Sequence, residues 1–178
     1  MNFKNLLLVA GLIIVISSIS YYFLGGLNDI QYSIQSAKPY NLIGKEYSGS
    51  NSSIKLKSIY DQMKELLDST FPGGVLVIVN DESQYDPEDN KVWYFIGIIP
   101  KSSTYPEQIP EDYIVRRFNS KKIVRAKIEA HNLVMPKPEK VRDQARTLAE
   151  REGLELSQYS IEKYLDEGVM EIDFLVKD

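Results

Sequence analysis

The fold is decided by residues 53–79, which read SIKLKSIYDQMKELLDSTFPGGVLVIV. Four apolar residues recur at helical spacing in the first part of this stretch: Ile59, Met63, Leu66 and Leu67. Such spacing is typical of one face of an amphipathic helix, which we expect to begin near Ser53. The helix is predicted to stop before Pro72-Gly73-Gly74, and the apolar run Val75–Val79 that follows is typical of a strand.

The same pattern returns 82 residues later. A second amphipathic helix is predicted after Pro138, ending at Gly153, and its apolar face carries Val141, Ala145, Leu148 and Ala149. Strand-like segments flank the two helices in the same order. They are Leu42–Tyr47, Val75–Val79 and Val92–Ile99 in the first half, and Val124–Glu129, Tyr159–Leu165 and Val169–Val176 in the second. Each half therefore reads strand, helix, strand, strand.

These duplicated halves predict an α+β fold, in which a curved antiparallel sheet carries two helices on one face. One additional strand is expected before each half, at Ile30–Gln35 and at Tyr113–Phe118. The second of these is predicted to turn at Asn119-Ser120 and to form a hairpin with the next strand. The seam between two similar halves is also where we expect a ligand cleft.

An uncharged apolar run, Leu6 to Leu27, precedes the duplicated region. About 22 residues of helix, rising ~1.5 Å each, would cover the ~30 Å hydrocarbon core of a bilayer. We therefore predict a transmembrane anchor at residues 1–27 and a ligand-binding domain at residues 28–178. The lipid bilayer is then the partner of Leu6–Leu27, and the protein is a single-pass membrane protein.

A cleaved signal peptide is the alternative for this segment. Lys4 and the small residues Ser18-Ile19-Ser20 partly fit such a peptide, but the apolar character continues beyond the expected cleavage site. The positive-inside rule does not assign a side to the domain, because Lys4 before the span is balanced by Lys38 and Lys45 after it.

Composition narrows the classes of function. Residues 28–178 carry all 25 acidic residues and all but one of the 21 basic residues, giving a net charge of −5, so no nucleic acid is expected as a partner. The chain has no cysteine, which excludes disulfides and thiol chemistry. Its single histidine, His131, is expected at the surface rather than as a haem ligand, and we expect no metal or cofactor.

The duplicated region resembles the GyrI-like small-molecule-binding domains. This family includes the effector-binding domains of multidrug-responsive transcription activators and the DNA gyrase inhibitory protein. The resemblance spans residues 30–178 and rests on the doubled half together with local patterns at Pro39-Tyr40, Tyr94–Ile98, Ile161–Tyr164 and Glu171–Val176. With its N-terminal span, the chain looks like the membrane-anchored branch of that family. The resemblance implies an aromatic-lined cleft with a ligand-binding acid in a strand after the second helix.

That acid corresponds to Glu162, and Tyr164 lies two residues on, facing the same side of the strand. A carboxylate among aromatic rings attracts a lipophilic cation through its charge and through the ring quadrupoles. The alternative interpretation is an exposed strand glutamate that pairs with Lys163 or with a neighbouring strand.

Three further residues are candidates for binding a ligand. Glu171, on the last strand, is a weaker candidate than Glu162. Trp93 and Tyr94 alternate faces of their strand, so at most one of them can line the cleft.

We expect a membrane-tethered, non-enzymatic domain that binds a hydrophobic or cationic small molecule between its halves. One alternative is a protein-interaction module with a vestigial cleft. Another is a hydrolase of reactive small molecules that uses Glu162. No catalytic residue is assigned, because the sequence offers no second positioned acid, nucleophile or oxyanion donor.

Overall fold

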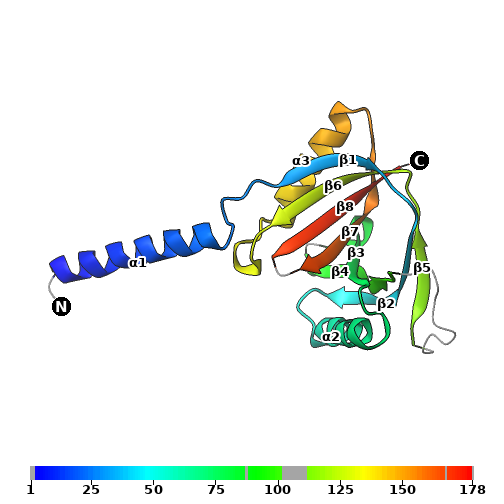
Figure 1. Ribbon diagram of the computed structural model, residues 1–178, viewed down its shortest axis with the longest axis horizontal. Coiled ribbons are helices and arrows are strands. Elements are labelled where there is room, and N and C mark those ends of the chain that lie inside the picture. Colours follow the sequence, from blue (N-terminus) through cyan, green and yellow to red (C-terminus); the bar gives the residue numbers. More distant parts are fainter. Residues whose placement is uncertain (1–2, 87, 102–111, 167, 178) are drawn as a thin grey trace.

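The computed structural model describes residues 3–86, 88–101, 112–166 and 168–177. Within these residues the chain forms three α-helices, two short 3-10 helices and one eight-stranded antiparallel sheet (Figure 1). The helices are α1 (Phe3–Phe23), α2 (Ile54–Thr70) and α3 (Pro138–Arg151), and the 3-10 helices are η1 (Glu82–Gln84) and η2 (Asn132–Val134). The strands are β1 (Gln31–Ser36), β2 (Tyr40–Ser50), β3 (Val75–Asp81), β4 (Lys91–Ile99), β5 (Ile114–Phe118), β6 (Lys122–Glu129), β7 (Leu156–Asp166) and β8 (Val169–Val176).

The predicted α+β fold with two helices on one face of a curved sheet is confirmed. The Ser53 side chain caps α2 by accepting a hydrogen bond from the Lys55 amide at 3.1 Å. Pro138 opens α3, where its missing N–H costs nothing, and Gly153, with φ +66°, follows its end. Both helices therefore begin and end close to where the sequence predicts.

The strand order is β1-β6-β8-β7-β3-β4-β2-β5, and it places the two edge strands differently from expectation. β1 pairs with β6 of the second half, and β5 pairs with β2 of the first half. The hairpin predicted at Asn119-Ser120 is therefore wrong. The Ser120 hydroxyl donates to the Val176 carbonyl at 2.9 Å and accepts from the Val176 amide at 3.2 Å. These bonds hold the turn beside the end of β8, so β5 continues away from β6 instead of folding back onto it.

Each helix covers its own half of the sheet. Val141, Ala145 and Ala149 of α3 pack on β6 and β8, while Ile59 and Met63 of α2 pack on β2, β3 and β4. These are the apolar faces that the 82-residue repeat predicts.

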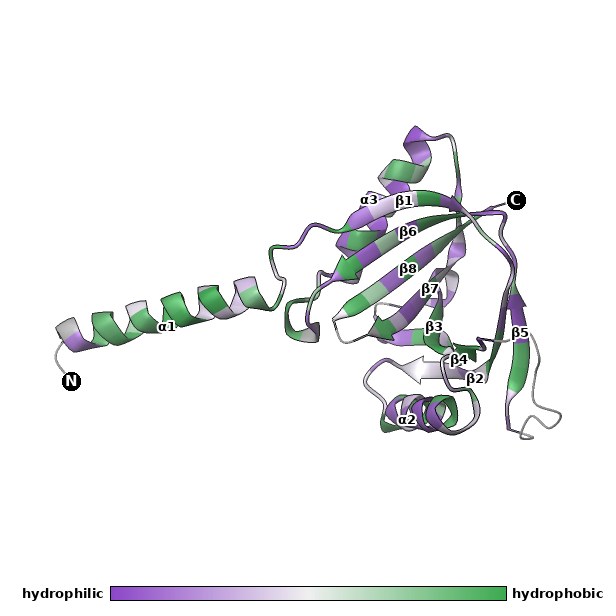
Figure 2. Cartoon of the chain, viewed as in Figure 1, coloured by the Kyte–Doolittle hydropathy of each residue, from purple (hydrophilic) through white to green (hydrophobic). Residues whose placement is uncertain are grey.

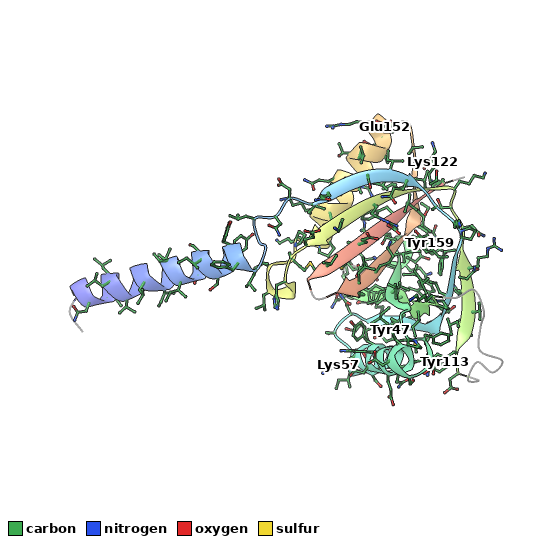
Figure 3. The ribbon with its side chains drawn as sticks, in the orientation of Figure 1. Tyr47, Lys57, Tyr113, Lys122, Glu152 and Tyr159 are labelled. Atoms are coloured by element: carbon green, nitrogen blue, oxygen red, sulfur yellow. The ribbon has the colours of Figure 1, made fainter. Side chains whose placement is uncertain are left out.

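The opposite face of the sheet has an apolar core of its own because the sheet is strongly curved. Phe118 of the edge strand β5 meets Tyr159 of β7, with 5.4 Å between ring centroids, although three strands separate β5 from β7 in the sheet. Phe95 of β4 lies in the same cluster and is fully buried. We call this face the inner face; Tyr159, which packs on it, is labelled in Figure 3.

The helix α1 extends away from the domain, and its surface is apolar along its length (Figure 2). Residues Asn5–Phe23 are long and apolar enough to cross a membrane, and none of this stretch is buried against the domain. A signal sequence would share these properties, whereas the core helix of a soluble protein would be mostly buried.

The helix ends at Phe23, four residues before the end of the predicted span, because a glycine turn follows. Gly25 has φ +79°, and a Cβ added to it would lie 2.7 Å from the Glu129 carbonyl oxygen. Two hydrogen bonds attach this turn to the domain. The backbone amide of His131 donates to the Leu24 carbonyl at 2.9 Å, and the side-chain amide of Asn28 donates to the backbone carbonyl of Glu129 at 2.7 Å.

Candidate functional site

Glu162 lies in the middle of the sheet, on β7 between β3 and β8. Its cross-strand neighbours are Ile78 of β3 and Ile172 of β8. Directly opposed residues in a sheet share a face. Ile78 packs under α2 and Ile172 packs under α3, so Glu162 lies on the helix-covered face where the two halves meet.

One tyrosine bonds the carboxylate of Glu162, and two more lie on the same side of the sheet. The Tyr164 hydroxyl donates a hydrogen bond to Glu162 Oε2 at 3.0 Å. The ring of Tyr60, from α2, packs edge-on against Tyr164, with centroids 6.1 Å apart and planes at 83°. Tyr94 of β4 lies on the same face, and its hydroxyl donates to Asn51 at 3.2 Å. We call the group formed by Glu162, Tyr164, Tyr60, Tyr94 and Arg142 the seam site.

Arg142, from the first turns of α3, supplies the cation of the seam site. Its Nε lies 2.6 Å from a carboxylate oxygen of Glu82 in η1. Its charge also acts on the pKa of Glu162 and of Tyr94, although neither forms an ion pair with it among the described residues. Arg142 is therefore held by Glu82 while it lies close to Glu162.

Burial controls protonation at the seam site. It raises the pKa of Glu162 above the ordinary value, and the Tyr164 hydrogen bond and the charge of Arg142 only partly oppose this shift. Burial and the negative charge of Glu162 raise the pKa of Tyr94 to about 12 and raise that of Tyr164 as well. The tyrosines thus remain neutral hydrogen-bond donors at neutral pH, and Glu162 is the group able to change charge.

The structure brings Glu162, Tyr164 and Tyr94 together and separates the other two predicted site residues from them. Trp93 lies on the opposite face of β4, where the Arg116 guanidinium stacks over its ring at 5.2 Å. Glu171 also lies on that opposite face, opposed to Lys163 and Lys127 in the neighbouring strands. Strand alternation is the physical reason, since the helices cover only one of the two faces.

Glu171 belongs instead to a charge-balanced cluster on the inner face. Lys163 lies 2.6 Å from Glu171 and 2.8 Å from the fully buried Asp173. Arg125 Nε lies 2.7 Å from Asp173, whose other oxygen accepts a hydrogen bond from Tyr40 at 2.6 Å. The alternative pairing of Glu162 with Lys163 is therefore wrong, because Lys163 points to the other side of the sheet.

The sequence interpretation missed Tyr60 and Arg142, yet a signal for both was available. The two residues are 82 positions apart, so they occupy the same place in the repeated helices, directly after the buried Ile59 and Val141. In the sheet, the two halves meet where β3 pairs with β7. The repeat therefore places one residue from each helix beside the same central strand, and in this chain one is aromatic and the other cationic.

No protein-family model matches the sequence, and no curated protein is significantly similar to it. Solved structures share its architecture. The EcmrR C-terminal domain aligns with a TM-score of 0.58 at 15% identity, covering 84% of this chain and 98% of that domain. The chain has the fold of the EcmrR C-terminal domain.

Two further structures extend the comparison. EcmrR in its DNA complex aligns with a TM-score of 0.59 at 14% identity, covering 98% of this chain and 69% of EcmrR. A hydrolase from Listeria innocua aligns with a TM-score of 0.54 at 12% identity, covering 83% of this chain and 92% of the hydrolase. Identities this low show a common fold and nothing about function.

Proposed function

We propose that residues 28–178 bind a hydrophobic small molecule with a positive charge at the seam site, and that α1 tethers this domain to a membrane. One observation carries the proposal. The side chain of Glu162 is largely buried where the two halves meet, and among the described residues its single hydrogen bond comes from Tyr164, with no ion pair. Arg142 acts on Glu162 only from a distance, because it pairs with Glu82, and a lipophilic cation would supply a counter-charge in direct contact.

The energetics favour such a ligand. An ionised carboxylate that is buried without a partner costs several kcal/mol, and a cation beside it removes much of that cost. The rings of Tyr60, Tyr94 and Tyr164 add attraction of about 0.5–2 kcal/mol for each cation–π contact that forms. Asp173, on the opposite face, does not need a cationic ligand, because Arg125 and Lys163 already neutralise its charge. The resemblance to GyrI-like domains implies the same class of ligand.

Entry of a ligand requires movement at the seam site. The ring of Tyr60 packs edge-on against Tyr164, the residue whose hydroxyl donates to the Glu162 carboxylate. Tyr60 belongs to α2, which packs on one half of the sheet, whereas Arg142 belongs to α3, which packs on the other. We expect binding to displace the Tyr60 ring and to draw α2 away from α3.

The anchor makes the membrane the place of action in this proposal. A molecule that is both apolar and cationic concentrates at a bilayer surface, so a domain tethered there meets it at high local concentration. The acidic domain is not expected to contact nucleic acid. Sensing or sequestering the cation is therefore the proposed role.

The test is a fluorescence titration of the full chain in nanodiscs with rhodamine 6G, a lipophilic cationic dye. Glu162→Gln is expected to bind the dye at least about tenfold more weakly, a loss of ~1.4 kcal/mol. Dye that partitions into the bilayer contributes equally to both titrations. Glu46→Gln is the matched control, because Glu46 is a strand glutamate on the opposite face that pairs with Arg116.

Two other outcomes would change the assignment. If neither rhodamine 6G nor a broader panel of lipophilic cations binds the wild type, the domain is better explained as a protein-interaction module. The raised pKa of Glu162 also favours general acid–base catalysis, so hydrolysis is a second candidate function. Recovery of the bound compound unchanged after long incubation would rule out hydrolysis of that compound.

A further inference from the structure

We infer that the domain makes a second contact with the membrane, through a cavity at the base of α1 that binds the phosphate headgroup of an anionic phospholipid. Leu133 of η2 inserts into the bilayer beside this cavity. The inference rests on the proposed tether, because α1 supplies the membrane. It concerns a different part of the molecule from the seam site.

The cavity has a volume of about 790 Å³ and lies between the glycine turn after α1, the start of β1, η2 and α3. Such a volume is in the range of small-molecule sites, which span ~300–1,000 Å³. Part of its lining is apolar and suits the start of an acyl chain: Ile30, Val134, Met135 and Leu148. Tyr32 also lines the cavity, and its hydroxyl donates a hydrogen bond to Gln144 at 2.8 Å.

The charges of the lining favour an anion. Lys137 and Lys140, at the start of α3, and Arg151, near its end, line the cavity. Asp29 and Glu129 line it too, but the Glu129 carboxylate already pairs with Lys127. Basic residues next to a membrane attract anionic lipids, and the two lysines at the start of a helix also add to the positive end of its dipole.

Because the cavity lies next to the end of the proposed span, we expect it at the depth of the lipid headgroups. The span ends at Phe23, and the hydrogen bonds of Leu24 and Asn28 hold the next residues against the end of β6. In Figure 1 the short coil after β6, which contains η2, lies beside the point where α1 meets the domain.

The same end of the domain exposes large apolar side chains. Phe23 and Leu133 are each 80% exposed, and Leu27 is 67% exposed. Exposure of this kind is unfavourable in water and favourable at a bilayer interface. Because Leu133 is brought to this end by a different part of the chain, the domain has two separate attachments to the same surface.

The absence of cysteine makes a clean experiment possible. Leu133→Cys is labelled with an environment-sensitive fluorophore in the full chain, which is then reconstituted into nanodiscs. Some of the phospholipids carry a nitroxide quencher near the headgroup end of one acyl chain. Ile54→Cys is the matched control, because Ile54 is also apolar, is 88% exposed, and begins α2 away from the cavity. The label at position 133 is expected to be strongly quenched, and the label at position 54 is not.

The headgroup assignment is tested by placing the quencher on phosphatidylglycerol or on phosphatidylcholine in otherwise identical nanodiscs. Quenching at position 133 is expected to favour phosphatidylglycerol about tenfold. Lys137→Glu with Lys140→Glu is expected to abolish this preference. Lys55→Glu with Lys57→Glu, at the start of α2 (Lys57 is labelled in Figure 3), is expected to keep it.

The outcomes separate this inference from the proposed function. A chain that reconstitutes but shows equal, weak quenching at positions 133 and 54 overturns the second contact. Strong quenching at position 133 without a headgroup preference overturns the lipid site. A chain that does not reconstitute at all refutes the tether, and the inference falls with it, whereas binding of rhodamine 6G through Glu162 is measured separately.

Discussion

Tyr164 donates its hydroxyl hydrogen to the carboxylate of Glu162, which lies two residues earlier on the same strand and the same face, at 3.0 Å. The bond stabilises the ionised form of a carboxylate that burial would otherwise drive towards the neutral form. In the proposed site, Tyr164 would therefore keep Glu162 available to a cation, and the bond lies within one strand, independent of any movement of the helices.

Replacing Tyr164 by Phe is expected to weaken binding of rhodamine 6G about fivefold at neutral pH. The variant loses a hydrogen bond to a charged acceptor, worth ~1 kcal/mol or more, and the pKa of Glu162 rises further. Fluorescence titration in nanodiscs measures the effect. Tyr159→Phe is the control, since Tyr159 packs against Phe118 on the opposite face. Equal loss in the two variants would contradict a direct role for Tyr164.

Binding is expected to weaken as the pH is lowered, and to do so at a higher pH than for an ordinary glutamate with a pKa of ~4.3. Burial raises the pKa of Glu162, so the carboxyl takes up a proton earlier, and the protonated form has no charge to offer a cation. Below that pKa, the affinity should fall by about tenfold per pH unit. Titrations from about pH 8 down to about pH 4 measure this, and Glu162→Gln should give a flat profile. A flat wild-type profile would mean that Glu162 does not bind the dye in its ionised form.

The inner-face cluster is expected to govern stability rather than binding. Asp173→Asn leaves the positive charges of Arg125 and Lys163 without their buried partner, which costs about 3–5 kcal/mol of unfolding free energy. Denaturant unfolding of the full chain in detergent, followed by near-UV circular dichroism, measures the loss. Asp61→Asn on α2, an exposed position, is the control and should change little.

The same cluster predicts a loss of stability in acid. Burial alone would raise the pKa of Asp173. Hydrogen bonds from Arg125 and the charge of Lys163 outweigh burial and hold this pKa below its ordinary value. The stabilisation is therefore complete above the unfolded-state pKa of ~3.9 and is lost as the pH falls through the lower folded-state pKa. Asp173→Asn should lack this component of the acid transition. An unchanged acid transition in the variant would assign it to other carboxylates.

Gly25→Ala is expected to loosen the attachment of α1 to the domain. The new Cβ would lie 2.7 Å from the Glu129 carbonyl oxygen, and the left-handed φ of +79° adds about 1 kcal/mol of strain for an L-residue. Hydrogen exchange at the His131 amide, which bonds to the Leu24 carbonyl, should accelerate about tenfold. Gly153→Ala, with φ +66° but no atom within 4 Å of its added Cβ, controls for backbone strain alone. Unchanged exchange in Gly25→Ala would show that the turn adapts without releasing Leu24.

The sequence predicted the elements that depend on local pattern. The stripe from Ile59 to Leu67 and its repeat after Pro138 located both helices, because burial of one face requires apolar residues at helical spacing. The partners of β1 and β5 could not be predicted in this way. β1 reads QYSIQS and carries little apolar pattern, and its pairing with β6 joins segments about 90 residues apart.

The residues of the site could also be predicted only where local pattern decides them. Alternation alone places Glu162 and Tyr164 on one face and separates Trp93 from Tyr94. Which face the helices cover depends on tertiary packing, so the choice of Tyr94 over Trp93 needed the structure. The same holds for Glu171, whose partners Lys163 and Arg125 come from two other strands.

The pairing of β1 with β6 has a mechanical consequence for the proposed tether. A pull through α1 enters at Gln31, beside Lys127 at one end of β6, whereas β8 ends beside Ile123, at the other end of β6. A load between these points runs along the strands, and the ladder bonds of β1–β6 and β6–β8, which lie across the strands, resist it together in shear. Had β1 paired as a hairpin at the anchored end, the same load would open its bonds one after another. With α1 as the proposed anchor, the domain is therefore expected to stay folded under a pull that would open a hairpin.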